Sequence, residues 1–390
     1  MAAPLLLVAG LYLPTSRFEV ISRDLLAIAC GILGAILLAL LLRPRGVLSK
    51  FSTANSAAIN IILIIATLAS PFTDFTYGAF AAPLLLSLIL ATRLKDLPLT
   101  RSARYLFVAV NLVNFGAGIL IVTGNDEFRR FLLDNYAAFY PELLPFMLEL
   151  NKPVLTFATH SLAGFFLYLF FYLNLETFKV TRSKTALALA LGNLGLLVFV
   201  NSVTAYALLG LAALQLVGHF QWHKSLLASL TANFLLLGLV AYFGPRLAGS
   251  DDIVAEIQHV MDSRDNGLRG RYAATGGLAA NLRYVAQNPL SPVGAGYSSE
   301  LHYGDSGPLE YFIRGSFPLV LAVYLGLFLF FRDNLISRGR ALFLFFLFLG
   351  FEFGFSNLNY PRTLYFLPFL VIYLNSLDRI ASRRRERARV

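Results

Sequence analysis

Long apolar runs alternate with short polar stretches along most of the chain, a pattern that predicts membrane-spanning helices. The runs fall near residues 4–14, 24–42, 54–72, 78–92, 105–124, 161–178, 185–201, 203–218, 225–243, 309–331, 341–356 and 363–377. Most are too long for the strands of a membrane barrel, so helices are expected. The pattern predicts an all-α integral membrane protein, a polytopic helical bundle of about 12 transmembrane helices forming a single membrane domain over residues 1–390.

The composition agrees with this class. The chain is 57% hydrophobic and only 14% charged, whereas soluble domains are about 25% charged. A soluble globule, a disordered chain, collagen and a coiled coil are therefore excluded. The one cysteine, Cys30, sits in an apolar run with no second cysteine to pair with. With no Cys/His cluster either, neither a disulfide nor a zinc site is supported, and no metal or cofactor is expected.

The distribution of lysine and arginine predicts the orientation of the spans. Most of these residues fall in short loops near 43–50, 93–104, 179–184 and 332–340, and in the tail 378–390. Alternating spans place all of these segments on one side, which the positive-inside rule assigns to the cytoplasm together with both termini. The net charge of +10 thus reflects topology, and nucleic-acid binding is not expected. The tail 378–390 is interpreted as a basic cytoplasmic anchor against anionic lipid.

Two longer loops lie on the opposite, outer face, a smaller one over 125–160 and a large one over 244–308. Long loops in compact proteins are usually functional, so the chemistry is expected there. Both loops contain amphipathic stretches, EFRRFLLDNY in the first and DDIVAEIQHVMDS and GGLAANLRYVAQNP in the second. Each stretch predicts a short helix, either lying on the membrane surface or packing against neighbouring spans.

Cationic side chains also occur in the loops of this outer face. The positive-inside rule does not account for them, so they need another explanation. Guanidinium binds phosphate in a bidentate manner and stays charged, so a lipid-linked pyrophosphate would suit such a cluster. The alternative is ion pairing with nearby acids at a solvated surface, which contributes little. The candidate phosphate-binding residues are Arg264, Arg269, Arg271 and Arg283, with Arg314 just inside the next span and Lys152 in the smaller loop.

The segment GAGYSSELHYGDSGPLEYF carries further candidates. Gly294 and Gly296 predict a tight turn with close backbone approach. His302 and Asp305 follow just before a span, where either is suited to be a general base. Glu310 and Glu352 fall at or within spans, where ionisable residues are usually functional, although Glu352 could equally pair with an internal arginine. Nucleotide and serine-hydrolase motifs are absent from the sequence.

This order of spans and loops resembles the superfamily of O-antigen polymerases and ligases. The resemblance rests on GRY, NLRYVAQNPLSPVGAGY and HYGDSGPLEYFIRGSFPLVL in the large loop. KPVLTFATHSLAGFFLYLFF and NSVTAYALLGLAAL, earlier in the chain, are also similar to family segments. The turn departs from the family pattern at Ser291-Pro292. The residues after His302, YGDSG, are closer to a polymerase than to a ligase.

The resemblance implies a glycosyltransferase-C-like bundle in the bacterial inner membrane, with the large loop in the periplasm. It implies that Arg271 and Arg283 hold pyrophosphate and that His302 and Asp305 lie near the acceptor hydroxyl. It also implies that the turn of Gly294, Gly296 and Tyr297 shapes the substrate site, while Arg264, Arg269, Arg314 and Lys152 are added on charge and position.

The expected function is a metal-independent polysaccharide polymerase that transfers an undecaprenyl-pyrophosphate-linked glycan onto a lipid-linked repeat unit. An O-antigen ligase that transfers the glycan to lipid A-core is the nearest alternative. A lipid-linked oligosaccharide flippase or other transporter is an alternative of another class. Expected partners are the lipid-linked glycans and membrane lipid, with a chain-length regulator and a flippase as further candidates.

Overall fold

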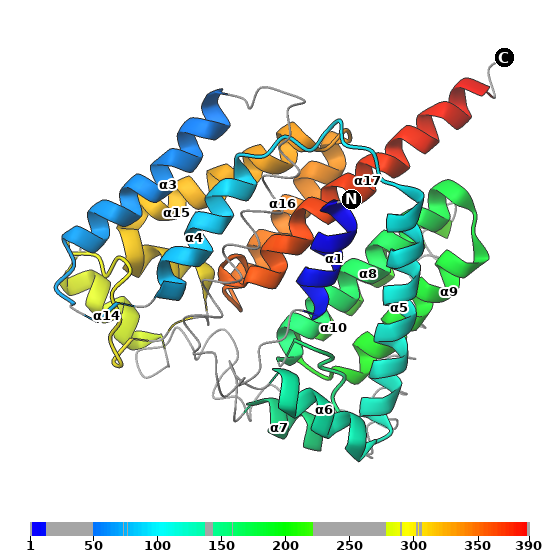
Figure 1. Ribbon diagram of the computed structural model, residues 1–390, viewed down its shortest axis with the longest axis horizontal. Helices are drawn as coiled ribbons and strands as arrows, with labels where there is room; N and C mark the ends of the chain where they lie inside the picture. The colour runs from blue at the N-terminus through cyan, green and yellow to red at the C-terminus, as the bar shows by residue number, and fades with distance from the viewer. Residues whose placement is uncertain are drawn as a thin grey trace. The chain divides into compact units, whose positions relative to one another are not determined.

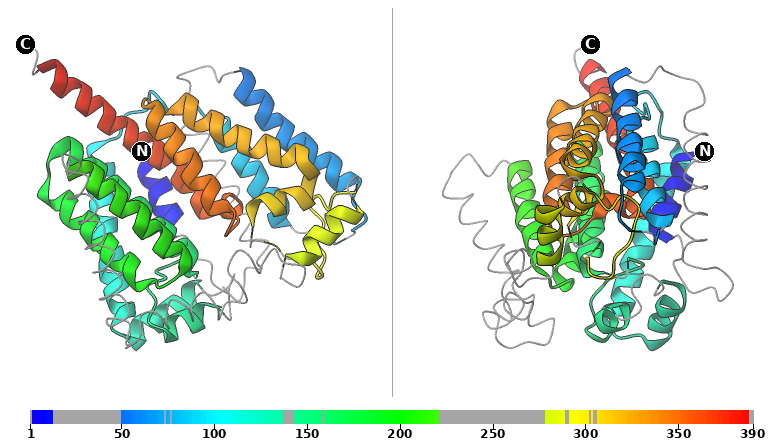
Figure 2. Two further views of the ribbon diagram at one scale, coloured as in Figure 1. Left: turned by 180° about the vertical axis from the view of Figure 1, so that it is seen from behind. Right: turned by 90° about the vertical axis from the view of Figure 1, so that its left-hand side faces the viewer.

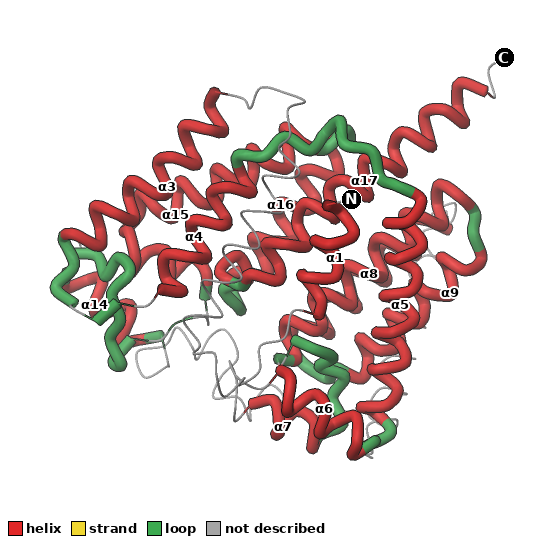
Figure 3. Tube along the Cα trace, in the orientation of Figure 1, coloured by secondary structure: helices red, strands yellow, loops and turns green. Residues whose placement is uncertain are grey.

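The computed structural model describes residues 2–12, 50–72, 74–75, 77–136, 143–157, 159–220, 278–288, 291–301, 303 and 306–387. Within these ranges the regular structure is helical, and the only strand-like pairing is an isolated bridge between Phe75 and Gly296 (Figure 3). The all-α class is therefore confirmed for this part of the chain.

Helices occur where the apolar pattern predicts them. Each predicted run that falls on described residues coincides with a helix, while the runs at 24–42 and 225–243 lie outside them. The elements are α1 (Ala2–Tyr12), α3 (Lys50–Leu68), α4 (Tyr77–Leu90), α5 (Arg101–Val122), α6 (Asp126–Tyr136), α7 (Leu143–Glu149), α8 (His160–Thr181), α9 (Lys184–Phe199), α10 (Val203–Phe220), α14 (Ala279–Gln287), α15 (Gly307–Asn334), α16 (Arg338–Glu352), the 3₁₀ turn η2 (Asn357–Asn359) and α17 (Pro361–Arg387).

Four of these helices, α5, α8, α15 and α17, are long and apolar enough to cross a membrane. α5 also exposes large apolar side chains, among them Leu112, Val113 and Ile119. A surface of this kind is costly in water and is suited to contact with lipid. The structure therefore has the character of a helical membrane protein, and the count of about 12 spans stays a prediction.

Hydroxyl side chains determine where several helices begin. The side chains of Thr159, Ser183 and Ser337 accept hydrogen bonds from backbone N–H groups in the first turns of α8, α9 and α16. Such caps satisfy donors that have no partner inside the helix. The amphipathic stretches at 126–136 and 279–287 form α6 and α14, so the helices predicted there are confirmed, whereas DDIVAEIQHVMDS lies outside the described residues.

The chain divides into two compact units. The first contains α1, α3, α4 and α14–α17, and the second contains most of α5 together with α6–α10. In the first unit α1 packs along α17 and α3 along α15 (Figures 1 and 2). In the second unit α9 and α10 pack against α8, which is buried at His160 and from Leu162 to Glu176.

α15 is a broken helix. Gly315 and Ser316 leave helical geometry, and Ser316 has a φ of 57°, so the helix consists of a short segment over 307–314 and a longer one over 317–334. The hydroxyl oxygen of Tyr324 lies 3.1 Å from the position that a Cβ would take on Gly307. An unbroken helix would separate these residues by about 25 Å. The short segment therefore folds back beside the longer one, and the run predicted at 309–331 is not one straight helix.

Candidate functional site

Residues 293–297, which we call the glycine turn, lie between the end of α3 and the short segment of α15. The backbone N–H groups of Val293 and Gly294 donate to the carbonyls of Ile313 and Arg314, at 2.8 and 2.9 Å. On the α3 side, the N–H of Ala295 donates to Thr67 Oγ1 at 3.0 Å. The turn is thus held on both sides by hydrogen bonds to segments far away in the sequence.

Two positions of the turn require glycine. Gly294 has a φ of +61°, and a Cβ there would overlap the backbone of Thr67. A Cβ on Gly296 would lie 2.9 Å from the Cβ of Phe72. Positive φ and close backbone approach are the conditions that favour glycine, so the tight turn predicted from the sequence is confirmed here.

A buried ion pair lies beneath the turn. Arg314 Nε is 3.1 Å from Glu310 Oε1, one helical turn earlier, and both side chains are only 7% exposed. Arg314 Nη1 donates to the carbonyl of Gly294 at 3.0 Å. Charged groups are rarely buried unless they are paired. The pairing at this spacing therefore accounts for how a glutamate and an arginine side chain fit inside the unit.

A stack of aromatic rings continues this arrangement to the surface. The guanidinium carbon of Arg314 lies 4.9 Å from the ring centroid of Tyr303, and the rings of Tyr303 and Tyr297 stack with centroids 5.5 Å apart. The Tyr303 hydroxyl accepts a hydrogen bond from the N–H of Ser298. Burial raises the pKa of the Tyr303 phenol above its usual value, so this hydroxyl stays neutral at physiological pH. Tyr297 is exposed and forms the outer end of the stack.

A second buried carboxylate lies where α16 ends. Glu352 is fully buried and accepts hydrogen bonds from the N–H of Leu358 at 2.7 Å and from the hydroxyl of Tyr324 at 3.3 Å. A Cβ on Gly307 would overlap this carboxylate. The carboxylate therefore lies against the first residue of the short segment of α15. The donors found for it are a backbone amide and a phenol, and not the internal arginine that the sequence left open.

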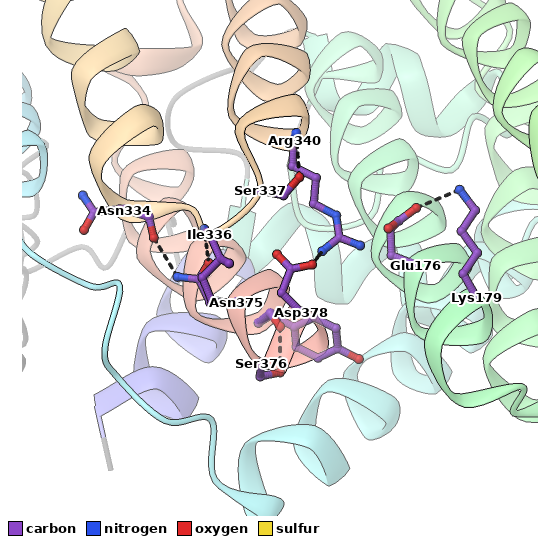
Figure 4. A network of polar contacts seen from close by, with 10 residues as sticks. Glu176, Lys179, Asn334, Ile336, Ser337, Arg340, Asn375, Ser376 and Asp378 are labelled. Carbon is purple, nitrogen blue, oxygen red and sulfur yellow. Dashed lines mark hydrogen bonds and ion pairs between the residues drawn. The ribbon is translucent and has the colours of Figure 1, made fainter. Parts of the chain in front are cut away.

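The opposite end of α15 is closed by a different polar network (Figure 4). Asn375 of α17 donates to the carbonyl of Asn334 at 2.7 Å and accepts from the N–H of Ile336 at 3.0 Å. Arg340 and Asp378 form an ion pair beside it. The two hydrogen bonds of Asn375 satisfy backbone groups in the connection between α15 and α16, which is a structural role.

The structure brings some of the predicted site residues together. Gly294, Gly296, Tyr297 and Arg314 meet at the glycine turn. Arg283 lies exposed on α14, where its Nε donates to the carbonyl of Ala279 in its own helix. The neighbouring Tyr284 anchors α14 to the same region, because its ring packs against Phe72 and its hydroxyl donates to Ser291.

Other predicted residues are not part of this cluster. Lys152 belongs to the second unit, where its Nζ donates to the carbonyl of Asn201 at 3.0 Å. Five predicted residues lie outside the described residues, namely Arg264, Arg269, Arg271, His302 and Asp305. Among the residues that are described, no group of three or more histidine, cysteine, aspartate or glutamate side chains is arranged to hold a metal ion.

The sequence analysis missed some of the contacts that build the site. Thr67 and Tyr303 had no assigned role, although one binds the glycine turn and the other covers Arg314. The pairing of Glu310 with Arg314 had a signal, because opposite charges four residues apart meet on one helix face. The contact of Thr67 with Ala295 had none, because 228 positions separate the two residues.

The glycine turn presents the exposed ring of Tyr297, and the neighbouring helix α14 carries the exposed cation Arg283. Flat aromatic faces and guanidinium groups suit a ligand that carries both sugar rings and phosphate. No protein-family model, curated protein or solved structure matches the chain.

Proposed function

We propose that this chain is a polysaccharide polymerase of the bacterial inner membrane. It transfers a glycan from undecaprenyl pyrophosphate onto a lipid-linked repeat unit at the periplasmic face. The observation that carries the proposal is the glycine turn, which is anchored to a buried ion pair, together with the exposed Arg283 on α14, a helix that Tyr284 joins to the same region. Pre-organised groups of this kind lower the cost of orienting a substrate.

The proposed topology places this site outside the cytoplasm. About 12 spans, with both termini inside, put the loops 125–160 and 244–308 in the periplasm. The basic tail 378–390 then faces anionic lipid on the cytoplasmic side. A glycosyltransferase-C-like bundle with a lateral opening would admit two lipid-linked substrates.

The proposed reaction needs one base and one anion-binding group. His302 or Asp305 takes the proton of the acceptor hydroxyl as its oxygen bonds to the anomeric carbon of the donor. The bond from that carbon to the phosphate oxygen breaks, and undecaprenyl pyrophosphate leaves. Arg283, with Arg264, Arg269 and Arg271, stabilises the charge on the leaving group. Pyrophosphate is already a good leaving group, so no metal or other cofactor takes part.

Purified protein in liposomes with lipid-linked repeat units tests the proposal. A ladder of longer glycans is expected, unchanged by EDTA, and R283A and D305A should each strongly reduce it. R104A is the matched control, because Arg104 is exposed at the predicted cytoplasmic end of α5. Transfer to added lipid A-core instead of chain growth would identify a ligase. Full ladders from R283A and D305A would remove the site assignment.

One structural feature favours a second candidate, a flippase or other transporter for lipid-linked glycans. Transporters often bind substrate at discontinuous helices, and buried charges within spans commonly mark their pathways. The broken helix α15, with Glu310, Arg314 and Glu352 buried around it, has this character. Movement of labelled lipid-linked glycan across liposomes that lack any acceptor would support this candidate over the polymerase.

A further inference from the structure

Arg314 is enclosed on several sides. Its Nε is 3.1 Å from Glu310, its Nη1 is 3.0 Å from the Gly294 carbonyl, and the Tyr303 ring covers one face. The residue is only 6% exposed. With Nε and Nη1 engaged in this way, a phosphate that bound side-on, through Nε and an Nη nitrogen, would have to displace Glu310. Displacement would leave Glu310 buried without its cation, which is strongly unfavourable.

Arg314 holds both backbone groups of Gly294. The side chain donates to the Gly294 carbonyl at 3.0 Å, and the Arg314 carbonyl accepts from the Gly294 N–H at 2.9 Å. Gly294 is also the residue of the turn with positive φ. One arginine therefore fixes the position at which the turn reverses direction.

The same side chain supports the aromatic stack from below. The ring of Tyr303 contacts both the guanidinium of Arg314 and the ring of Tyr297. A cation over an aromatic face contributes more when it is desolvated, as it is here. Movement of Arg314 would therefore be transmitted both to the backbone of the turn and to the exposed ring.

We propose that Arg314 is a positioning residue and not a ligand of the substrate phosphate. Together with Glu310, it holds the glycine turn and the pair of tyrosines in place, while Arg283 on α14 provides the exposed cation. The identity of the ligand rests on the proposed polymerase function. The positioning of the turn does not, and it can be measured without any substrate.

Cysteine labelling measures the position of the turn directly. The only cysteine of the chain is Cys30, so C30S provides a background without thiols. V293C then reports on opening of the turn, because Val293 is fully buried, and S299C is the exposed control. The probe is a membrane-impermeant maleimide added from the outer side.

Loss of a charge-assisted hydrogen bond should raise the rate of labelling at V293C by about tenfold or more. This rise is expected for R314M and for E310Q, with a smaller rise for R314K, while labelling at S299C stays unchanged. If R314M fails to insert, R314K and E310Q carry the test. Unchanged labelling at V293C in the folded variants would overturn the proposal.

Kinetic measurements with lipid-linked repeat units distinguish whether Arg314 positions the turn or binds the substrate phosphate directly. Positioning predicts that E310Q lowers kcat in the same way as R314M, although Glu310 would touch no substrate, and that R314K rescues part of the loss. A direct phosphate ligand predicts that E310Q keeps or improves the KM for the donor, and that result would overturn the proposal. Faster labelling in a protein that makes no polymer under any condition would support the positioning role and reject the polymerase function.

Discussion

The two compact units place polar groups among apolar helices in different ways. The first unit buries charged side chains, Glu310, Arg314 and Glu352, around a helix that breaks. The second unit also buries Glu176, but it joins its helices through neutral amides, on helices that stay continuous. There, Asn111 accepts hydrogen bonds from Asn174 at 2.7 Å and from Asn193 at 2.9 Å, which joins α5, α8 and α9.

Asn111, Asn174 and Asn193, which we call the asparagine cluster, satisfy most of their hydrogen-bonding groups among themselves and within their own helices. Each of its amide groups also donates to the carbonyl four residues earlier in its own helix, at Phe107, Phe170 and Leu189. Amides arranged in this way join helices at modest cost. Buried charges cost far more unless every partner is present, and they are rarely kept for stability alone. The comparison therefore favours the first unit as the place of the proposed site, with the amides of the second unit joining its helices.

The largest expected effect is removal of Arg314, which takes away the cation that pairs with the buried Glu310. R314M should lower the free energy of unfolding by about 3–5 kcal/mol, measured by SDS titration in mixed micelles. D126N in the second unit is the comparison, because Asp126 is 82% exposed in its pair with Arg129 at 3.6 Å. Its loss should cost at most about 1 kcal/mol.

The double variant E310Q/R314M sharpens this result. Removing both charges should restore part of the stability that R314M alone loses, because no isolated carboxylate remains. A double variant as unstable as R314M would mean that packing, and not charge, dominates at this position.

The next largest effect is expected at Gly307, the first residue of the short segment of α15. G307A adds a methyl group that overlaps the Glu352 carboxylate and should destabilise the first unit by about 1–3 kcal/mol. Gly210 in α10 has nothing within 4 Å of its Cβ position, so G210A should be neutral or slightly stabilising. Thermal unfolding in detergent compares the two. Equal melting temperatures would contradict the close approach of Gly307 to α16.

A smaller effect is expected in the asparagine cluster. N111A removes the shared acceptor and should cost about 0.6–1.7 kcal/mol, the range seen for hydrogen bonds between membrane helices. Denaturant unfolding of N111A, N174A and the double variant measures the coupling between the two side chains. A loss as large as that of R314M would erase the distinction between the units.

The smallest effect is expected for helix contact in the second unit. A Cβ on Gly118 would lie 2.6 Å from a methyl group of Leu196, whereas a Cβ on Gly116 meets nothing within 4 Å. Because Leu196 can shift its rotamer, G118A should cost only about 0.5–1.5 kcal/mol, and G116A should cost nothing. Melting curves of this matched pair on α5 provide the check. A larger loss for G116A would contradict the packing of α5 against α9.

The sequence predicted the parts of the fold that depend on local pattern. Apolar runs located helices, the amphipathic stretches located α6 and α14, and the GAG motif located the turn. The hydropathy pattern did not predict the break in α15. Hydropathy is averaged over a window, and in LEYFIRGSFPLVL apolar side chains continue on both sides of the break. Gly315, Ser316 and Pro318 were a local signal for that break.

The sequence grouped Arg314 with the residues of the glycine turn in one candidate site, but it did not reveal the partners of Arg314. Charge alone suggested a phosphate ligand, whereas the structure shows the guanidinium enclosed by Glu310, Gly294 and Tyr303. Whether an arginine is enclosed or exposed depends on contacts between segments about 20 residues or more apart, here Gly294 with Arg314. Periodicity and composition carry no information on such contacts.

The break in α15 has a consequence for how the protein is made. The carbonyls of Ile313 and Arg314 end the short segment and find their donors in Val293 and Gly294. Those donors leave the ribosome first, so the short segment can be capped as it emerges, without waiting for α16 or α17. A circular permutant with new ends between 297 and 307 would reverse this order of synthesis.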